Sequence, residues 1–108
     1  MPLKSVPQYA VIDAAAAGDN TLVAAVTGKK IRVLSAVLVA SGGAITVRFE
    51  SGAAGTALTG LMDLTADGQL VVPLNGFGWF ETAAGALLNL ELSAATLVAG
   101  ALVYEEVE

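Results

Sequence analysis

Residues 44–50 read AITVRFE, and the strict alternation of this stretch decides the fold class. In an extended strand Ile45, Val47 and Phe49 lie on one face, because successive side chains point to opposite sides. The polar residues between them share the other face. This pattern is typical of a half-buried β-strand. We therefore predict a strand here whose apolar face is turned toward a core.

The same type of pattern recurs on both sides of this stretch. Residues 86–93 (ALLNLELS) alternate in the same way, and further β-type runs lie between clusters of Gly, Asn, Asp and Ser. These runs cover residues 8–12, 20–26, 29–41, 55–62, 68–73, 77–82 and 96–104. The helix-favouring run of residues 14–17 is too short to stand alone. About eight strands at this spacing predict one all-β domain over residues 1–108, an antiparallel β-sandwich or a barrel.

Two of the predicted strands are apolar on both faces. In residues 31–40 the odd-numbered set and the even-numbered set are both mainly apolar, and the same holds for residues 96–104. A sandwich strand normally has one face in water, so the second face needs cover from another subunit or a packed loop. The small residues Ala36, Ala40 and Gly100 are expected to allow close approach there.

The composition also predicts a contact surface. The chain is 56% hydrophobic and 14% charged, whereas about a quarter of the residues of an ordinary soluble domain are charged. The uncharged run from Val33 to Val47 has 15 residues and is interrupted by Ser41-Gly42-Gly43, too short for a membrane-spanning helix of about 20 residues. No signal-peptide pattern follows the start of the chain. We therefore expect a homo-oligomer and no membrane partner.

The residue inventory argues against catalysis. The chain has neither cysteine nor histidine, which removes thiolate metal sites, the usual general base and the commonest metal ligand. Residues 63–68 (DLTADG) imitate the start of a calcium loop, but Leu74 stands at the twelfth position, where a glutamate is needed. We expect a hairpin turn at Asp67-Gly68 instead. The prediction is a protein that is not an enzyme, with no catalytic residues, cofactor or metal.

The charges are segregated along the chain. The net charge is −5, but all five basic residues precede residue 49 and all but two of the acids follow it. Overall acidity argues against a nucleic-acid partner. The asymmetry is compatible with opposite faces that pair between neighbouring subunits or orient the protein on a charged surface. It is equally compatible with solvated loops and edges.

Residues 76–82 (GFGWFET) hold three of the six aromatic residues. In an extended segment Phe77 and Trp79 share one face and Phe80 lies on the other. Buried aromatics are expected in a core or an inter-subunit seam. An exposed Trp79 beside Asn75 and Glu81 is expected in a sugar-binding platform. Packing, in the core or at a subunit seam, is the preferred interpretation of Phe77, Trp79 and Phe80.

The segments NTLVAAVTGKKIRVLSAVLVA (20–40), SGAAGTALTG (51–60) and ALLNLELSAATLVAGALVYEEV (86–107) resemble small structural proteins of tailed-bacteriophage virions. These include capsid decoration, or cement, proteins with a jelly-roll β-sandwich. The similarity rests on the style of the strands and on the ending GxLVY. It implies a jelly roll, a trimer that binds the major capsid protein on the phage head, and synthesis in the cytoplasm of a bacterial host.

Under this resemblance Lys4, Lys29, Lys30 and Arg32 are the candidate contacts to an acidic shell or a neighbouring subunit. Residues 1–9, with their two prolines, are a candidate extended N-terminal arm. Two alternatives stay open. One is a carbohydrate- or receptor-binding β-sandwich module of a phage fibre or spike, with a glycan at the Trp79 region. The other is a monomeric barrel with a cavity for a small ligand.

Overall fold

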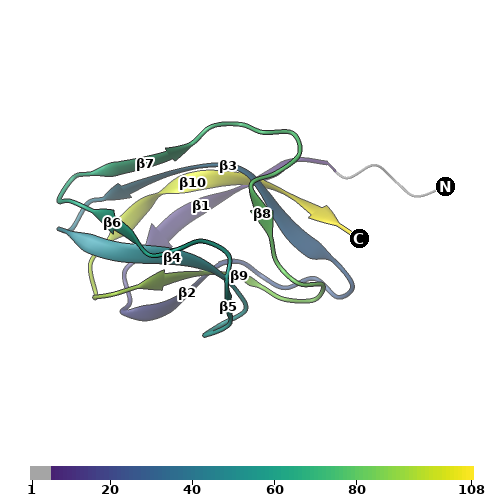
Figure 1. Cartoon of the computed structure of the whole chain (residues 1–108), viewed down its shortest axis with the longest axis horizontal. Helices are drawn as coiled ribbons and strands as arrows, with labels where there is room; N and C mark the ends of the chain where they lie inside the picture. Colours follow the sequence, from purple (N-terminus) through teal and green to yellow (C-terminus); the bar gives the residue numbers. More distant parts are fainter. Residues whose placement is uncertain (1–5) are drawn as a thin grey trace.

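The structure is a computed structural model that describes residues 6–108. Over this range the chain forms ten β-strands and no helix. They make two antiparallel sheets of five strands each, which pack face to face as a sandwich (Figure 1). The predicted all-β sandwich in a single domain is confirmed.

The two sheets, called sheet A and sheet B, each combine strands from both ends of the sequence. Sheet A has the order β1 (Gln8–Ala14), β10 (Val98–Val107), β3 (Lys30–Ala40) and β7 (Gln69–Val72), with β8 (Phe80–Glu81) also paired to β3. Sheet B has the order β2 (Gly18–Val23), β9 (Leu88–Leu92), β4 (Ile45–Ser51) and β5 (Thr56–Ala57), with β6 (Met62–Leu64) also paired to β4.

The pairing follows a nested order. β1 pairs with β10, β2 with β9, β3 with β7 and β8, and β4 with β5 and β6. The first half of the chain thus pairs with the second half in reverse order, as in a long hairpin rolled into two sheets. This is the strand arrangement of a jelly roll. As a consequence, segments far apart in the sequence become neighbours throughout the molecule.

The core lies between the sheets and confirms the alternation of two predicted strands. In β4, Ile45, Val47 and Phe49 are buried, as are the three leucines of β9 that lie beside them. Each buried side chain of this size contributes roughly 1.5–3 kcal/mol through removal of apolar surface from water. The ring of Phe49 also packs against the ring of Phe80, with 5.0 Å between centroids. This contact ties sheet B to sheet A.

Strand β3 differs from the prediction because it contains a β-bulge. Val103 of β10 pairs with Ser35, whereas the next residue, Tyr104, pairs with Val33, so Leu34 is an extra residue. An extra residue shifts the side-chain alternation by one position. Before the bulge the odd-numbered residues face the core, and after it the even-numbered residues do so. The predicted division of residues 31–40 into two faces is therefore wrong.

The small residues of β3 and β10 have a different role from the predicted one. Ala36 and Ala40 belong to the buried core, so their side chains point away from the outer face of the sheet. A Cβ atom on Gly100 would lie 1.8 Å from the backbone carbonyl oxygen of Val37. Glycine at this position allows the central strands β10 and β3 to approach each other.

Two further predictions are wrong, one for residues 55–62 and one for the turn at Asp67-Gly68. Residues 55–62 do not form one strand, because β5 and β6 are separate short pieces on β4. The Asp67-Gly68 turn exists, and the Gly68 N–H donates to the Thr65 carbonyl oxygen at 2.8 Å. It is not a hairpin, however, since β6 belongs to sheet B and β7 to sheet A. The turn instead carries the chain from one sheet to the other.

Candidate functional site

The outer faces of the two sheets have opposite chemical character. The face of sheet B carries Asp19, Arg48 and Glu91, which lie side by side on β2, β4 and β9. The face of sheet A exposes large apolar side chains instead, with Tyr9 80% exposed and Val71 62% exposed. An antiparallel sheet normally has its outer face in water. The apolar outer face of sheet A is therefore the surface that we expect to bind a partner.

The strand register arranges this face in rows. The middle row consists of Val11, Ala101, Val37 and Val71, one from each of the strands β1, β10, β3 and β7. The next row begins with Tyr9, Val103 and Ser35. Both rows are free of charge across the width of the sheet. We call the residues of these two rows the apolar face.

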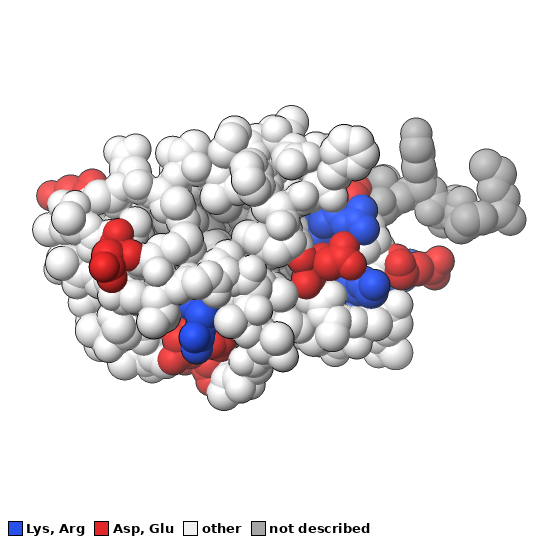
Figure 2. All heavy atoms as spheres, viewed as in Figure 1, with Lys and Arg blue, Asp and Glu red and all other residues white. Residues whose placement is uncertain are grey.

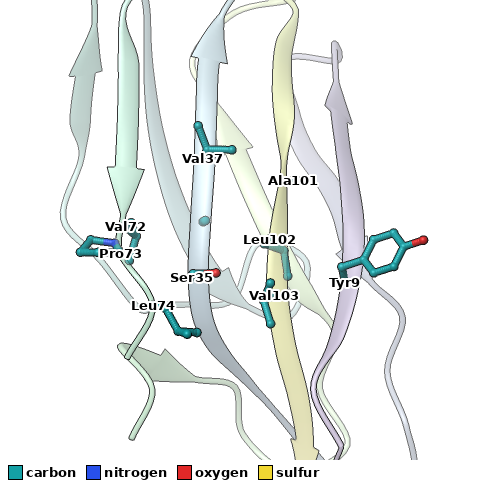
Figure 3. A pocket seen from close by; sticks show the side chains of 10 residues that line it. Tyr9, Ser35, Val37, Val72, Pro73, Leu74, Ala101, Leu102 and Val103 are labelled. Atoms are coloured by element: carbon teal, nitrogen blue, oxygen red, sulfur yellow. The ribbon is translucent and has the colours of Figure 1, made fainter. Parts of the chain in front are cut away.

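A groove is hollowed into the apolar face. It has a volume of about 480 Å³. The side chains that line it project from four adjacent strands, with Pro73 and Leu74 at one side and Tyr9 at the other (Figure 3). Ala101, Val103, Ser35 and Val37 lie between them. The shape and the uncharged lining suit an apolar side chain of another molecule.

Charged residues flank the apolar face at one end. Glu105, Arg32 and Glu81 lie side by side on β10, β3 and β8. The Arg32 Nε atom donates to Glu81 Oε1 at 2.9 Å, and the Arg32 guanidinium, followed by Lys30, holds the pKa of Glu81 below its usual value. In Figure 2 the charged side chains gather toward the two ends and the lower edge, while the surface over β7 is uncharged. An apolar centre with a polar margin is the anatomy of a protein interface.

The predicted basic contacts lie in ion pairs within the chain. Lys30 Nζ is 3.3 Å from Glu81, and Lys29 Nζ is 3.3 Å from Glu108. Arg32 pairs with Glu81 and, at 3.7 Å, with Glu105. These residues are partly exposed and remain near the apolar face, but their charges are already balanced locally. Lys4 lies outside the described residues, as do residues 1–5 of the predicted arm.

The aromatic cluster is divided between the core and the surface. Phe80 is partly buried and packs against the core. Phe77 is 91% exposed and Trp79 is 49% exposed. The Trp79 indole N–H donates to the Pro73 carbonyl oxygen at 2.7 Å, which fixes the ring. Only residues 80–81 of the predicted strand 77–82 are paired as a strand.

The polar groups expected beside Trp79 in a sugar site are engaged elsewhere. The Asn75 side-chain oxygen accepts the Phe77 backbone N–H at 2.9 Å. Glu81 is held by Arg32 and Lys30. A sugar platform needs hydrogen-bonding groups free to contact hydroxyls around the aromatic ring. The turn thus presents apolar surface more than polar recognition groups.

A buried polar network on sheet B was missed by the sequence analysis. Glu50 is 2% exposed, although it lies on the outward side of β4. Its Oε2 atom accepts two hydrogen bonds from Arg48, at 2.7 and 3.0 Å, and its Oε1 atom accepts one from Asn89 at 2.9 Å. The Asn89 side chain also donates to Asp19 at 2.8 Å. Cross-strand pairing creates this network, and no local motif could have revealed it.

Three carboxylates meet in this network. Oxygen atoms of Asp19, Glu50 and Glu91 lie within 4.8 Å of one another. The Ala54 backbone N–H lowers the pKa of Asp19, whereas the hydrogen bond to Asp19, together with burial, raises the pKa of Glu91. Carboxylate oxygens are ligands for hard cations, but the oxygens of Glu50 are already bonded to Arg48 and Asn89. The arrangement is a hydrogen-bonded polar network in which three carboxylates share one guanidinium, that of Arg48.

A second, smaller pocket of about 340 Å³ lies on sheet B and is lined in part by Thr46, Asp63 and Ser93. Over residues 6–108 every buried side-chain nitrogen or oxygen has a hydrogen-bond partner. Within the same range, no helix has the length and apolar character to cross a membrane.

No protein-family model matches the chain, and no curated protein matches its sequence. The apolar face is therefore the candidate functional site that the geometry favours.

Proposed function

We propose that this protein is a non-enzymatic structural subunit of a tailed-bacteriophage virion. It self-assembles as a trimer and decorates the phage head by binding the major capsid protein. The single observation that carries the assembly is the uncharged, exposed apolar face of sheet A. The resemblance of residues 20–40 and 86–107 to virion decoration proteins supports the location on the phage head.

The physical reason is that the face is costly to leave in water. Exposed apolar surface is unfavourable by roughly 25 cal/mol per Å² relative to burial, and contiguous patches of several hundred Å² mark interaction sites. A decoration protein also needs no chemistry of its own, because many weak contacts repeated over a lattice add up to firm attachment. The protein's composition and its paired surface charges fit this role.

Self-assembly is tested by the molar mass in solution, from size-exclusion chromatography with light scattering at moderate salt. We expect about three times the 10.8 kDa of one chain. The Val11→Lys variant places a charge in the middle row of the apolar face and should be monomeric. Thr21→Lys is the matched control, because Thr21 is also an exposed β-branched residue on an edge strand, but of sheet B. A wild-type monomer would contradict self-assembly.

Capsid attachment is tested separately by co-sedimentation with expanded phage heads. We expect the wild-type protein and the Thr21→Lys control to bind the expanded heads saturably. A protein that stays in the supernatant at every concentration would overturn the decoration role, whatever its oligomeric state.

The second candidate is a carbohydrate- or receptor-binding module of a phage fibre or spike. The observation in its favour is the exposed aromatic pair Phe77 and Trp79 on one turn. This function predicts saturable glycan binding that Trp79→Ala abolishes while the thermal unfolding transition stays cooperative. A glycan array that shows no binding to the wild-type protein would remove this candidate.

A further inference from the structure

The Phe77 turn is a rigid projection. The Asn75 N–H donates to the Leu34 carbonyl oxygen at 3.0 Å, and the Trp79 N–H donates to the Val33 carbonyl oxygen at 2.8 Å, which fixes both ends of the turn to β3. Inside the turn the Gly78 N–H donates to the Asn75 carbonyl oxygen, and Gly78 has a φ of +85°. The aromatic side chain of Phe77 is nevertheless 91% exposed. Because the backbone of the turn is already fixed, only the Phe77 side chain has to be ordered on binding.

The groove on the apolar face is a receptor for such a side chain. Its volume of about 480 Å³ has room for an aromatic ring. Phe77 is not among the residues that line it, so a chain does not fill its own groove with this ring. None of the lining residues is charged, and residues 68–80, which contain the projection, are uncharged as well. The two surfaces thus meet through uncharged residues, and the nearest cation of the turn is Arg32, whose side chain lies beside Gly78.

The available area is sufficient for a second copy of the chain. The exposed fractions of the apolar face and the Phe77–Trp79 turn correspond to on the order of 1,000 Å² of surface. A specific protein interface buries at least about 1,000 Å² in total. The turn of one copy and the face of another together offer an area of the same order as this threshold. In a closed ring each subunit makes two such contacts, which strengthens the assembly.

We infer that the Phe77 side chain of one copy inserts into the groove on the apolar face of a second copy. This inference rests on the proposed self-assembly and specifies which residues make the contact. Because the proposed trimer has three-fold symmetry, the projection of one copy meets the groove of the next copy, and the contact is head-to-tail. Such contacts repeat from copy to copy until a ring closes. Phe77 is then the aromatic anchor of the interface, and Ala101 and Val37 lie in its receptor.

The test uses two variants that each destroy one half of the contact. Phe77→Ala removes the projection and keeps the groove. Ala101→Arg fills the groove with a long charged side chain and keeps the projection. Light scattering should give about 10.8 kDa for each variant alone. Leu61→Ala is the control, because Leu61 is also an exposed large apolar residue but does not line the groove, and it should keep the wild-type mass.

The decisive measurement is an equimolar mixture of Phe77→Ala and Ala101→Arg. A head-to-tail contact predicts a heterodimer of about twice the single-chain mass, because the intact projection of one variant enters the intact groove of the other. A contact that does not join Phe77 to the groove predicts no such recovery. Monomers in the mixture, or a Phe77→Ala variant with the wild-type mass, would overturn the inference and leave the proposed function standing. A wild-type monomer would overturn both the inference and self-assembly, while co-sedimentation with heads decides the decoration role independently.

Discussion

Arg48 neutralises the most deeply buried carboxylate of the described chain, and its removal should be strongly destabilising. Glu50 is 2% exposed, and two of its three side-chain hydrogen bonds come from Arg48. Arg48→Met keeps the apolar stem but removes the guanidinium. Glu50 then keeps one hydrogen bond, from Asn89, and remains close to the carboxylates of Asp19 and Glu91.

The magnitude follows from the burial of the two partners. Removal of one partner from a buried ion pair costs about 3–5 kcal/mol, because the other charge stays buried without compensation. The Arg48 side chain is 33% exposed, so water can replace part of the guanidinium and reduces the loss. We expect a decrease of about 2–3 kcal/mol in the free energy of unfolding. For a domain of this size that corresponds to a fall in Tm of roughly 10–15 °C.

Urea unfolding followed by circular dichroism at pH 7 measures this loss. The double variant Arg48→Met/Glu50→Gln should recover about half of it, since a neutral amide is less costly to bury than a carboxylate. Arg48→Lys is the matched control, because it keeps the charge and loses the paired hydrogen bonds. For this variant we expect a decrease of about 1 kcal/mol in the free energy of unfolding. A loss below about 0.5 kcal/mol for Arg48→Met, within the range of an ordinary surface substitution, would refute the reasoning.

Two further stability predictions concern single positions. Gly100→Ala should destabilise the fold by about 3 kcal/mol, because its Cβ atom would meet the Val37 carbonyl oxygen. Gly60→Ala is the control, because a Cβ there meets no atom within 4 Å. Its free energy of unfolding in the same urea experiment should stay within about 0.5 kcal/mol of the wild-type value. The pKa of Glu91 in the folded protein is raised above its ordinary value of 4.5. Protonated Glu91 therefore stabilises the fold at pH values below 4.5, and this stabilisation is lost as the pH rises through the raised pKa. Glu91→Gln should therefore be more stable than the wild type at neutral pH and equal to it in acid; a difference that does not change with pH would contradict this assignment.

The local alternation of the sequence determined the strands and much of the core. Residues 44–50 and 86–93 were predicted as half-buried strands, and their apolar residues face the core as expected. A strand has a side-chain period of two whatever its partners are, so this pattern can be read from neighbouring residues alone. The scarcity of charge was likewise visible in the sequence. It predicted that some apolar surface would stay exposed, and the structure locates that surface on sheet A.

Only the tertiary structure decided which faces and charges meet. The bulge at Leu34 reverses the alternation of β3, and no local signal marks it, because it exists only relative to the register of β10. The sequence placed Phe77 and Trp79 on one face and Phe80 on the other, but it could not tell which face is buried. The pairing of β8 with β3 turns Phe80 toward the core and leaves the other two exposed.

The charged residues likewise show what the sequence determined and what only the tertiary structure decided. Basic residues cluster in the first half of the chain and acids in the second. The nested strand order lays one half against the other, so Arg32 meets Glu81 and Glu105, and Lys29 meets Glu108. The sequence determined that the charges are segregated, but the long-range pairing of strands decided that they neutralise one another within a single chain. That pairing depends on contacts between residues far apart in the sequence, and for that reason it could not be read from either half alone.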